Sequence, residues 1–266
     1  MVVFTDLDGT LLDDKTYSFD AAREALDELR ARAIPLILVS SKTRAEIEPI
    51  RLQLHNDHPF IVENGGAIVI PKGYFPFPLP DAISRSGYDF VEMGTPYDKL
   101  RVALKEIQQA IGKELRGYGD MSAEEIAERT GLSLEEARLS KKREYDEPFL
   151  ADGLHEGLVA AITTRGLCHT KGDRFHHLMG PHDKGRAVRY LIECYRRRTG
   201  HDKGALLSVA LGNSANDLPM LEAVDRPILV QLPDGSFQPG IATPRLTRAP
   251  APGPVGWNLA MRAFLQ

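Results

Sequence analysis

An apolar run at the amino terminus ends in two acidic residues, and this junction constrains the chain more than any other segment. Val2 to Phe4 predicts a buried strand, and Asp6-Leu7-Asp8-Gly9-Thr10 follows it. Continuous apolar runs are typical of parallel strands, and open α/β folds bind ligands where such strands end. Gly9 lets the chain turn there. Two neighbouring carboxylates favour a hard cation such as Mg²⁺ between them, although an acidic turn after a strand is the plain alternative.

Composition limits the classes of function. The 266 residues are 42% hydrophobic and 26% charged, which is typical of a soluble globular chain of one large or two modest domains. The formal charge of −4 gives no reason to expect nucleic acid or an anionic membrane as a partner, and a small polar substrate fits better. Two cysteines, no cleavable leader and no apolar stretch of about 18 residues lead us to expect a reduced, cytoplasmic protein.

Strand and helix patterns alternate over the first 70 residues, which predicts a parallel sheet with crossover helices. Helices are expected over 19–32 and 44–54, and a strand over 35–39. Four prolines between Pro71 and Pro80 predict a stiff boundary. We therefore expect the first part of a core domain at 1–80.

A different pattern follows, and we expect an inserted α+β cap domain at 81–176. It begins with a strand at Asp89 to Met93 and an amphipathic helix containing Leu100 and Ile111. Two capping-box patterns, at Ser122 and Ser133, predict two short helices. The alternation then resumes, so 177–266 is expected to be the second part of the core. The proline-rich segment Ala249 to Pro254 is expected to be a surface loop.

Three further segments lie where strands end or helices begin. Ser40-Ser41-Lys42-Thr43 follows a predicted strand and offers hydroxyl and amide groups to an anion, but alone it could be a helix cap. Lys184 opens a predicted helix. Gly212 to Asp217 follows the last long apolar run with oxygen donors that suit Mg²⁺, although a strand-to-helix loop explains it equally well.

Taken in order, these segments resemble the four motifs of the haloacid dehalogenase-like phosphatase superfamily. The resemblance implies a doubly wound, parallel-sheet, Rossmann-like α/β core with an inserted α+β cap. Four segments are more narrowly similar to the mannosyl-3-phosphoglycerate phosphatase branch: Ser40 to Thr43, Glu63 to Gly66, Arg143 to Phe149 and Arg174 to Gly180.

The resemblance also implies roles for single residues. Asp6 would attack phosphorus and form an aspartyl-phosphate, and Asp8 would protonate the departing oxygen and later deprotonate water. Ser40 would hydrogen-bond a phosphoryl oxygen, and Lys184 would supply positive charge and restrain Asp6. The expected Mg²⁺ ligands are Asp6, the main-chain carbonyl of Asp8, Asn213 and Asp217.

Asn213 departs from the superfamily pattern, because an Asp commonly stands at this position. Its amide oxygen can still coordinate a cation. The site would carry one less negative charge, so Mg²⁺ should bind more weakly unless Asp217 contributes directly or through water.

Substrate choice is expected to depend on the cap and on the loop that faces it. In that loop, Glu63 or Asn64 could bond sugar hydroxyls, and Gly65 and Gly66 permit close approach of the backbone, although a plain turn remains open. Ser41 and Lys42 belong to the same expected binding surface. In the cap, Arg138 and Lys142 could point toward a glycerate carboxylate, with a solvated basic helix face as the alternative, and Arg143 is also expected to bind substrate. His169, His176 and His177 are expected to be packing residues, at most one of them facing the site.

The leading hypothesis is a Mg²⁺-dependent phosphatase that converts mannosyl-3-phosphoglycerate to mannosylglycerate, a compatible solute, and phosphate. Glucosyl-3-phosphoglycerate or another sugar phosphate is the alternative substrate. A phosphohexomutase is the alternative reaction, since the same fold includes such enzymes. A non-catalytic sugar-phosphate sensor is disfavoured because Asp6, Asp8 and Lys184 are all present. A homodimer is the default expectation for its assembly.

Overall fold

The computed structural model describes residues 1–151, 156–171, 175–200 and 206–266. Its larger part is built on a nine-stranded sheet with the order β13-β12-β11-β1-β2-β3-β4-β6-β5. The strands are β1 (Val2–Thr5), β2 (Leu36–Val39), β3 (Phe60–Val62), β4 (Ala67–Pro71), β5 (Ala82–Arg85), β6 (Tyr88–Glu92), β11 (Ser208–Gly212), β12 (Arg226–Gln231) and β13 (Thr247–Pro252). The six strands from β13 to β3 run parallel, and β4, β6 and β5 extend the sheet antiparallel.

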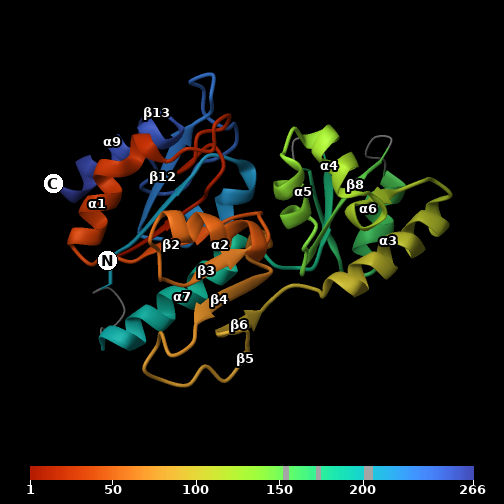
Figure 1. Cartoon of the computed structure of the whole chain (residues 1–266), viewed down its shortest axis with the longest axis horizontal. Helices are drawn as coiled ribbons and strands as arrows, with labels where there is room; N and C mark the ends of the chain where they lie inside the picture. The colour runs from red at the N-terminus through yellow and green to blue at the C-terminus, as the bar shows by residue number, and fades with distance from the viewer. Residues whose placement is uncertain (152–155, 172–174, 201–205) are drawn as a thin grey trace.

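Helices cover both faces of this sheet, as Figure 1 shows. One face packs against α1 (Arg23–Ala31), α2 (Arg44–Gln53) and α9 (Gly253–Leu265), and the other against α7 (Lys184–Thr199) and α8 (Leu218–Glu222). Alternation along β1 explains the two layers, because Val3 joins one core cluster while Val2 and Phe4 join the other. The expected doubly wound α/β core is confirmed.

The strand order places the carboxyl end of β1 at a topological switch point. β1 pairs with β11 on one side and with β2 on the other, so the chain winds outward in both directions from it. Ligands bind in the crevice that this arrangement leaves at the carboxyl ends of the strands. Behind it, the indole Nε1 of buried Trp257, on α9, donates to Thr5 Oγ1 at 3.0 Å.

A second, four-stranded antiparallel sheet has the order β7-β8-β10-β9. Its strands are β7 (Arg116–Gly117), β8 (Asp146–Leu150), β9 (Cys168–Lys171) and β10 (His176–Met179). The helices packed around it are α3 (Tyr97–Ile111), α4 (Ala123–Thr130), α5 (Leu134–Ser140) and α6 (Glu156–Thr163). The side chains of Ser122 and Ser133 accept the amides of Glu125 and Glu136 at the starts of α4 and α5, as their spacing predicts.

Strand pairing differs from two of the expected domain limits. The strand expected to open the cap at Asp89 to Met93 is β6, which pairs with β4 and β5 in the large sheet. The limit expected between residues 176 and 177 cuts through β10, which belongs to the small sheet. Proline density marks a break in secondary structure but does not indicate which sheet the next strand joins. We propose that the cap extends from the end of β6 to the end of β10.

The proline-rich segment Ala249 to Pro254 is not a surface loop, contrary to the sequence-based expectation. It forms most of β13 and the start of α9. β13 is the last strand of the large sheet, where prolines are tolerated because one side needs no ladder hydrogen bonds, and Pro254 occupies the first turn of α9, where no amide is required. The sequence also predicts a helix from about Leu154 to Thr164 and a hairpin across Lys171-Gly172-Asp173, and of these Leu154, Gly172 and Asp173 lie outside the described residues.

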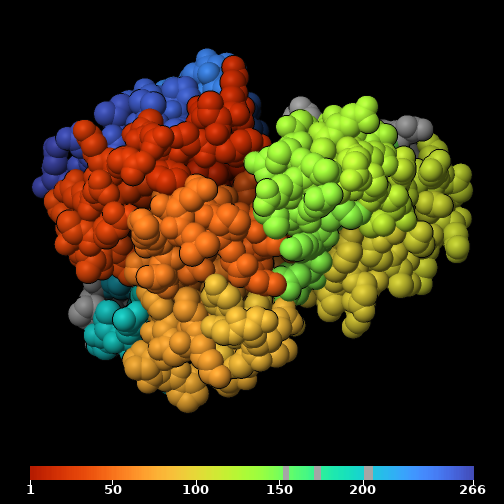
Figure 2. Space-filling model, in the orientation of Figure 1, coloured from red at the N-terminus to blue at the C-terminus, as the bar shows by residue number. Residues whose placement is uncertain are grey.

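Two chain segments connect the sheets and lie against each other. A Cβ atom placed on Gly180 would lie 2.8 Å from the amide nitrogen of Thr95, so the outgoing and returning segments touch. Figure 2 shows the cap as a separate lobe that meets the amino-terminal part of the core. Within the described part of the chain, no helix combines the length and apolar character that a membrane span requires.

Candidate active site

Three ionisable side chains meet at the switch point. Lys184, the first residue of α7, places its Nζ 2.7 Å from Asp6 Oδ1 and 2.6 Å from Asp217 Oδ1. Lys184 is 1% exposed, Asp6 6% and Asp217 0%. Burial and the Asp217 carboxylate raise the pKa of Asp6 to about 7, against the lowering by Lys184. Two buried carboxyl groups therefore share one ammonium group. An additional cation beside them would be favoured electrostatically.

Asp8 lies at the open side of this cluster. Its side chain is 38% exposed, and its Oδ1 lies 3.0 Å from Lys42 Nζ. Gly9, at a φ of +66°, makes the bend after Asp8, and a Cβ there would lie 2.5 Å from Asn213 Nδ2. A buried carboxylate and an accessible one thus follow the same strand, which suits a nucleophile beside a proton carrier.

Asn213 and Asp217 hold different positions in the loop after β11. The Asn213 side chain lies against the main-chain carbonyl of Asp8, with Nδ2 3.2 Å from that oxygen. Asp217 Oδ2 accepts bonds from the amides of Asn213 and Ser214 and from Ser214 Oγ, at 2.9, 2.9 and 3.0 Å. Because Lys184 occupies its other oxygen, Asp217 fixes the loop and the lysine, and Asn213 faces the β1 turn.

These donors fit a Mg²⁺ ion. Among the described residues, no three His, Cys, Asp or Glu side chains are grouped to hold a metal, so any ion must also use amide or main-chain oxygens. Asp6 and the carbonyl of Asp8 offer such oxygens beside a second buried carboxyl group, and Asn213, whose Nδ2 donates to that carbonyl, would turn its amide oxygen toward the ion. Hard cations take oxygen donors of this mixed kind.

Ser40 lies at the end of β2, the neighbour of β1, and is fully buried. Its Oγ accepts the amide of Lys42 at 3.2 Å. Thr43 caps α2 in a capping box with Glu46, and its Oγ1 also donates to Leu139 O of the cap at 3.1 Å. Residues 40–43 therefore belong both to the edge where Asp6 lies and to the contact with the cap.

The loop from Glu63 to Gly66 contacts the cap, but Glu63 is not open to a ligand. Its buried carboxylate accepts the amides of Glu144 and Tyr145, both at 2.9 Å. Burial raises the pKa of Glu63 to about 8, although the charge of Arg143 and these two amides lower it. Instead of a free position for a sugar hydroxyl, Glu63 has two hydrogen bonds to the α5–β8 segment, which we define as residues 141–145 of the cap.

The other loop residues have structural partners as well. Asn64 Oδ1 accepts Asn216 Nδ2 at 3.0 Å, which links this loop to the one after β11. Gly65 has a φ of +96°, and a Cβ there would lie 2.2 Å from Asp183 O. A Cβ on Gly66 would lie 2.5 Å from that of Tyr145. Gly65 thus permits close packing at the start of α7, and Gly66 permits it against the α5–β8 segment of the cap.

The three expected cap cations do not act as a group. Arg138 and Lys142 are exposed. Arg143 is largely buried and donates to Ser41 O at 2.9 Å and to Ser140 O at 3.0 Å, with Asp146 Oδ2 at 3.4 Å. Arg143 therefore joins cap to core, because its guanidinium group is already bonded to main-chain oxygens of both. Sequence reasoning missed its partners because they depend on long-range contacts.

The histidines of β9 and β10 pair within the cap, as their packing role predicts. His169 Nε2 lies 2.8 Å from His176 Nδ1, and His177 Nδ1 lies 2.7 Å from Asp146 Oδ2. Sequence reasoning missed His182, which is buried and places Nε2 3.2 Å from Glu63 O. The segment from Arg174 to Gly180, which resembles the mannosyl-3-phosphoglycerate phosphatase branch, begins with a residue that lies outside the described part of the chain.

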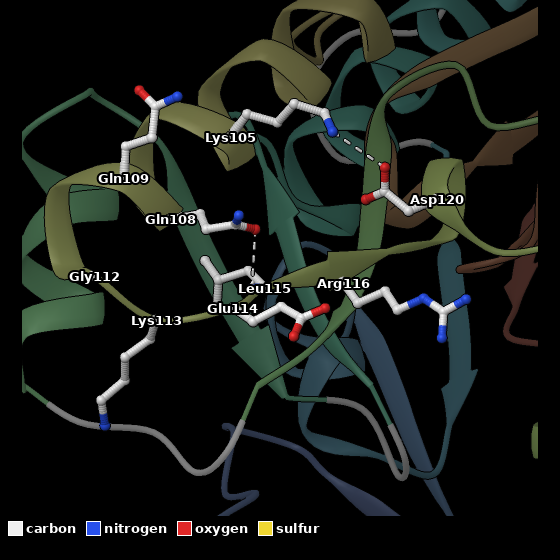
Figure 3. Close-up of a pocket in the computed structure, with 9 residues that line it drawn as sticks. All are labelled: Lys105, Gln108, Gln109, Gly112, Lys113, Glu114, Leu115, Arg116 and Asp120. Atoms are coloured by element: carbon white, nitrogen blue, oxygen red, sulfur yellow. Dashed lines mark hydrogen bonds and ion pairs between the residues drawn. The ribbon is translucent and has the colours of Figure 1, made fainter.

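A cavity of about 580 Å³ lies at the end of α3. Figure 3 shows its residues, which all come from the segment Lys105 to Asp120 of the cap. It therefore contains no member of the Asp6 cluster.

Comparisons with known proteins identify the family of this chain. Residues 3–76 match the family model of haloacid dehalogenase-like hydrolases. A glucosyl-3-phosphoglycerate/mannosyl-3-phosphoglycerate phosphatase of Methanococcoides burtonii is 47% identical over 98% of this chain and 95% of that protein. A mannosyl-3-phosphoglycerate phosphatase of Pyrococcus horikoshii is 39% identical over 86% and 90%.

Solved structures share the fold. A Thermoplasma acidophilum protein superposes with a TM-score of 0.67 at 18% identity, covering 100% of this chain and 98% of that one. The sucrose-phosphatase of Synechocystis superposes with a TM-score of 0.61 at 16% identity, covering 99% and 97%. The chain therefore belongs to the haloacid dehalogenase-like hydrolases and is a phosphatase of that family.

Proposed function

We propose that this chain is a Mg²⁺-dependent phosphatase that hydrolyses mannosyl- or glucosyl-3-phosphoglycerate to the glycosylglycerate, a compatible solute, and phosphate. The observation that carries the proposal is the position of Lys184 between Asp6 and Asp217, with Asp8 accessible beside them. The relative from M. burtonii, whose name includes both substrates, supports the choice of substrate.

In this mechanism a carboxylate oxygen of Asp6 attacks phosphorus, and the bond from phosphorus to the ester oxygen breaks. Asp8 gives its proton to that oxygen, which leaves as the hydroxyl of the glycosylglycerate. Asp8 then takes a proton from water as the water oxygen attacks the phosphoryl group on Asp6. Phosphate leaves, and both carboxylates return to their starting states.

The other residues position the phosphoryl group and balance its charge. Lys184 keeps Asp6 in place, and the hydroxyl of Ser40 would donate to a phosphoryl oxygen. Asp6, the Asp8 carbonyl and Asn213 would hold Mg²⁺, which neutralises charge on the phosphoryl oxygens when bound. Asp217 orients Lys184 and the loop that carries Asn213.

The test is phosphate release from both glycosyl-3-phosphoglycerates, with glucose 6-phosphate as a comparison ester, in Mg²⁺ and in EDTA. We expect metal-dependent release that strongly favours the glycosyl-3-phosphoglycerates, and the faster sugar identifies the preferred substrate. Release from glucose 6-phosphate alone would overturn the substrate assignment. Conversion of a sugar phosphate without free phosphate would indicate a mutase instead. The Asp6→Asn variant should fold and release no phosphate.

A further inference from the structure

Lys42 contacts two residues of the proposed site, Ser40 and Asp8. Its main-chain amide donates to Ser40 Oγ at 3.2 Å, and its Nζ lies 3.0 Å from Asp8 Oδ1. The side chain is only 13% exposed, and its ammonium lies 5.1 Å from the centroid of the Tyr17 ring. A long cationic side chain is thus fixed at the side where Asp8 would meet the departing oxygen.

A cavity of about 180 Å³ opens beside this lysine, between core and cap. Lys42, Tyr17 and Gln53 line it from the core, and Leu132, Glu136 and Leu139 line it from the cap. A dry cavity of about 150 Å³ can hold one benzene ring, so this space suits a single six-membered ring. Its aliphatic walls, a phenol, an amide and the two carboxylates of Glu46 and Glu136 match a sugar ring, which has apolar faces and hydroxyl edges.

Other basic side chains near this edge have different partners. Lys184 is bound between Asp6 and Asp217, and Arg143 donates to main-chain oxygens of Ser41 and Ser140. Arg138 and Lys142, which the sequence assigned to a carboxylate, are exposed. A cation at the departing-group side of Asp8 is therefore supplied by Lys42.

We propose that Lys42 binds the glycerate carboxylate of the substrate and that the cavity beside it receives the glycosyl ring. The inference rests on the proposed function and names the subsite for its departing group. In a 3-phosphoglycerate ester, two carbons separate the ester oxygen from the carboxylate carbon, a span of about 4 Å at roughly 1.5 Å per bond. The 3.0 Å between Asp8 Oδ1 and Lys42 Nζ lets one substrate reach both residues.

Three phosphate esters separate the two contacts. Glycosyl-3-phosphoglycerate has sugar and carboxylate, 3-phosphoglycerate has only the carboxylate, and glycerol 3-phosphate has neither. Inhibition constants for the two smaller esters, measured against glycosyl-3-phosphoglycerate hydrolysis, do not require that they are turned over. If a variant is too slow, dissociation constants in the Asp6→Asn background give the same ratios.

For Lys42→Met, we expect the preference for 3-phosphoglycerate over glycerol 3-phosphate to fall by about 10- to 100-fold, the range of a charge-assisted hydrogen bond. Lys42→Arg should recover part of that preference, and Lys142→Met should not change it. Equal weakening of both esters by Lys42→Met, or loss of the preference in Lys142→Met, would overturn the assignment of Lys42.

For Gln53→Trp, which fills the cavity from the surface of α2, we expect binding of the glycosyl ester to weaken by at least about 10-fold relative to 3-phosphoglycerate. Leu52→Trp is the matched control, because Leu52 is the adjacent residue, is 77% exposed and does not line the cavity. Equal effects of the two tryptophans would overturn the ring subsite. If the wild-type chain releases no phosphate from either glycosyl ester, the proposed function fails and this inference falls with it. If it does release phosphate and the ratios stay constant, only the inference fails.

Discussion

Lys184 is the side chain of the site that pairs with two buried carboxyl groups at once. One ammonium group, 1% exposed, balances two carboxylates that are themselves buried. Removal of one partner from such a cluster leaves charge that water cannot reach. The residue is thus expected to matter for folding as well as for turnover.

We predict that Lys184→Met lowers the free energy of unfolding by about 3 kcal/mol and lowers kcat at least about 100-fold. Urea unfolding and phosphate release measure the two effects. Lys105→Met is the control, because Lys105 is 62% exposed in its ion pair with Asp120 and should change stability by less than about 1 kcal/mol. Equal stability of Lys184→Met and the wild-type protein would contradict the ion-pair account.

Asn213 gives a prediction about the metal. Asn213→Asp adds a charge beside the carbonyl of Asp8, so the Mg²⁺ concentration for half-maximal activity should fall by about tenfold. Calorimetric titration of Mg²⁺ provides a readout that is independent of turnover. Asn216→Asp adds the same charge in the same loop, but its amide contacts Asn64, so it should not tighten binding in this way. Equal tightening in both variants would indicate a general effect of charge.

At the scale of elements, the α5–β8 segment of the cap and the loop after β3 form one unit. Glu63 accepts two amides of that segment, and both Glu63 and Asn64 adopt positive φ, at 47° and 58°. Such conformations cost free energy and persist where surrounding contacts hold them. The contacts to Glu144 and Tyr145 meet that condition.

This unit predicts a particular dependence of stability on pH. Burial raises the pKa of Glu63 from 4.5 to about 8, so the native state keeps a proton that the unfolded chain releases. The contribution of Glu63 is therefore complete below about pH 4.5 and is lost as pH rises to about 8, by at most about 1.4 kcal/mol per pH unit.

Glu63→Gln should remove this dependence, so the stability difference between wild type and variant should decrease across that window. Urea unfolding at several pH values measures it. Glu106→Gln, on an exposed part of α3, should give a curve parallel to that of the wild type. A parallel curve for Glu63→Gln would mean that its native pKa is not raised.

Most elements were predictable because their signals are local. The apolar runs of β1 and β11, the helix face of α3 and the serine caps of α4 and α5 are set by neighbouring residues. Membership of a sheet is not local, so the sequence did not show that β6 pairs with β4 and β5 in the large sheet, and β13 was missed because its prolines disguise an edge strand. The sequence predicted Asp6 and Lys184 as members of one site, and the structure brings them within 2.7 Å of each other. It could not show that Glu63 and Arg143 bind main-chain atoms of the opposite domain, because those contacts join residues far apart in the chain.

On the scale of the whole molecule, the cap is an insertion whose two connections touch, since Gly180 lies against Thr95. The core clusters are made almost entirely from residues outside it, with Tyr145 as an exception. Replacement of 95–180 by a short glycine-serine linker should therefore leave a folded core.

We predict that this truncated chain, with Glu63→Gln to avoid an unpaired buried acid, hydrolyses p-nitrophenyl phosphate and loses its preference for glycosyl-3-phosphoglycerates. Circular dichroism and phosphate release check the two parts. The full-length Glu63→Gln variant is the matched control. A truncated chain without a cooperative melting transition would show that the cap is needed for the core to fold.

The hydrogen bond between Trp257 and Thr5 makes tryptophan fluorescence a probe of the core. The chain has a single tryptophan, and its indole lies fully buried behind the strand that carries Asp6. Its emission spectrum therefore follows the environment at the base of β1, without a second indole in the cap to mix with it. A red shift of the emission during unfolding would therefore mark the step at which the core opens. If the cap unfolded at an earlier step, the far-ultraviolet ellipticity would fall while the fluorescence stayed unchanged.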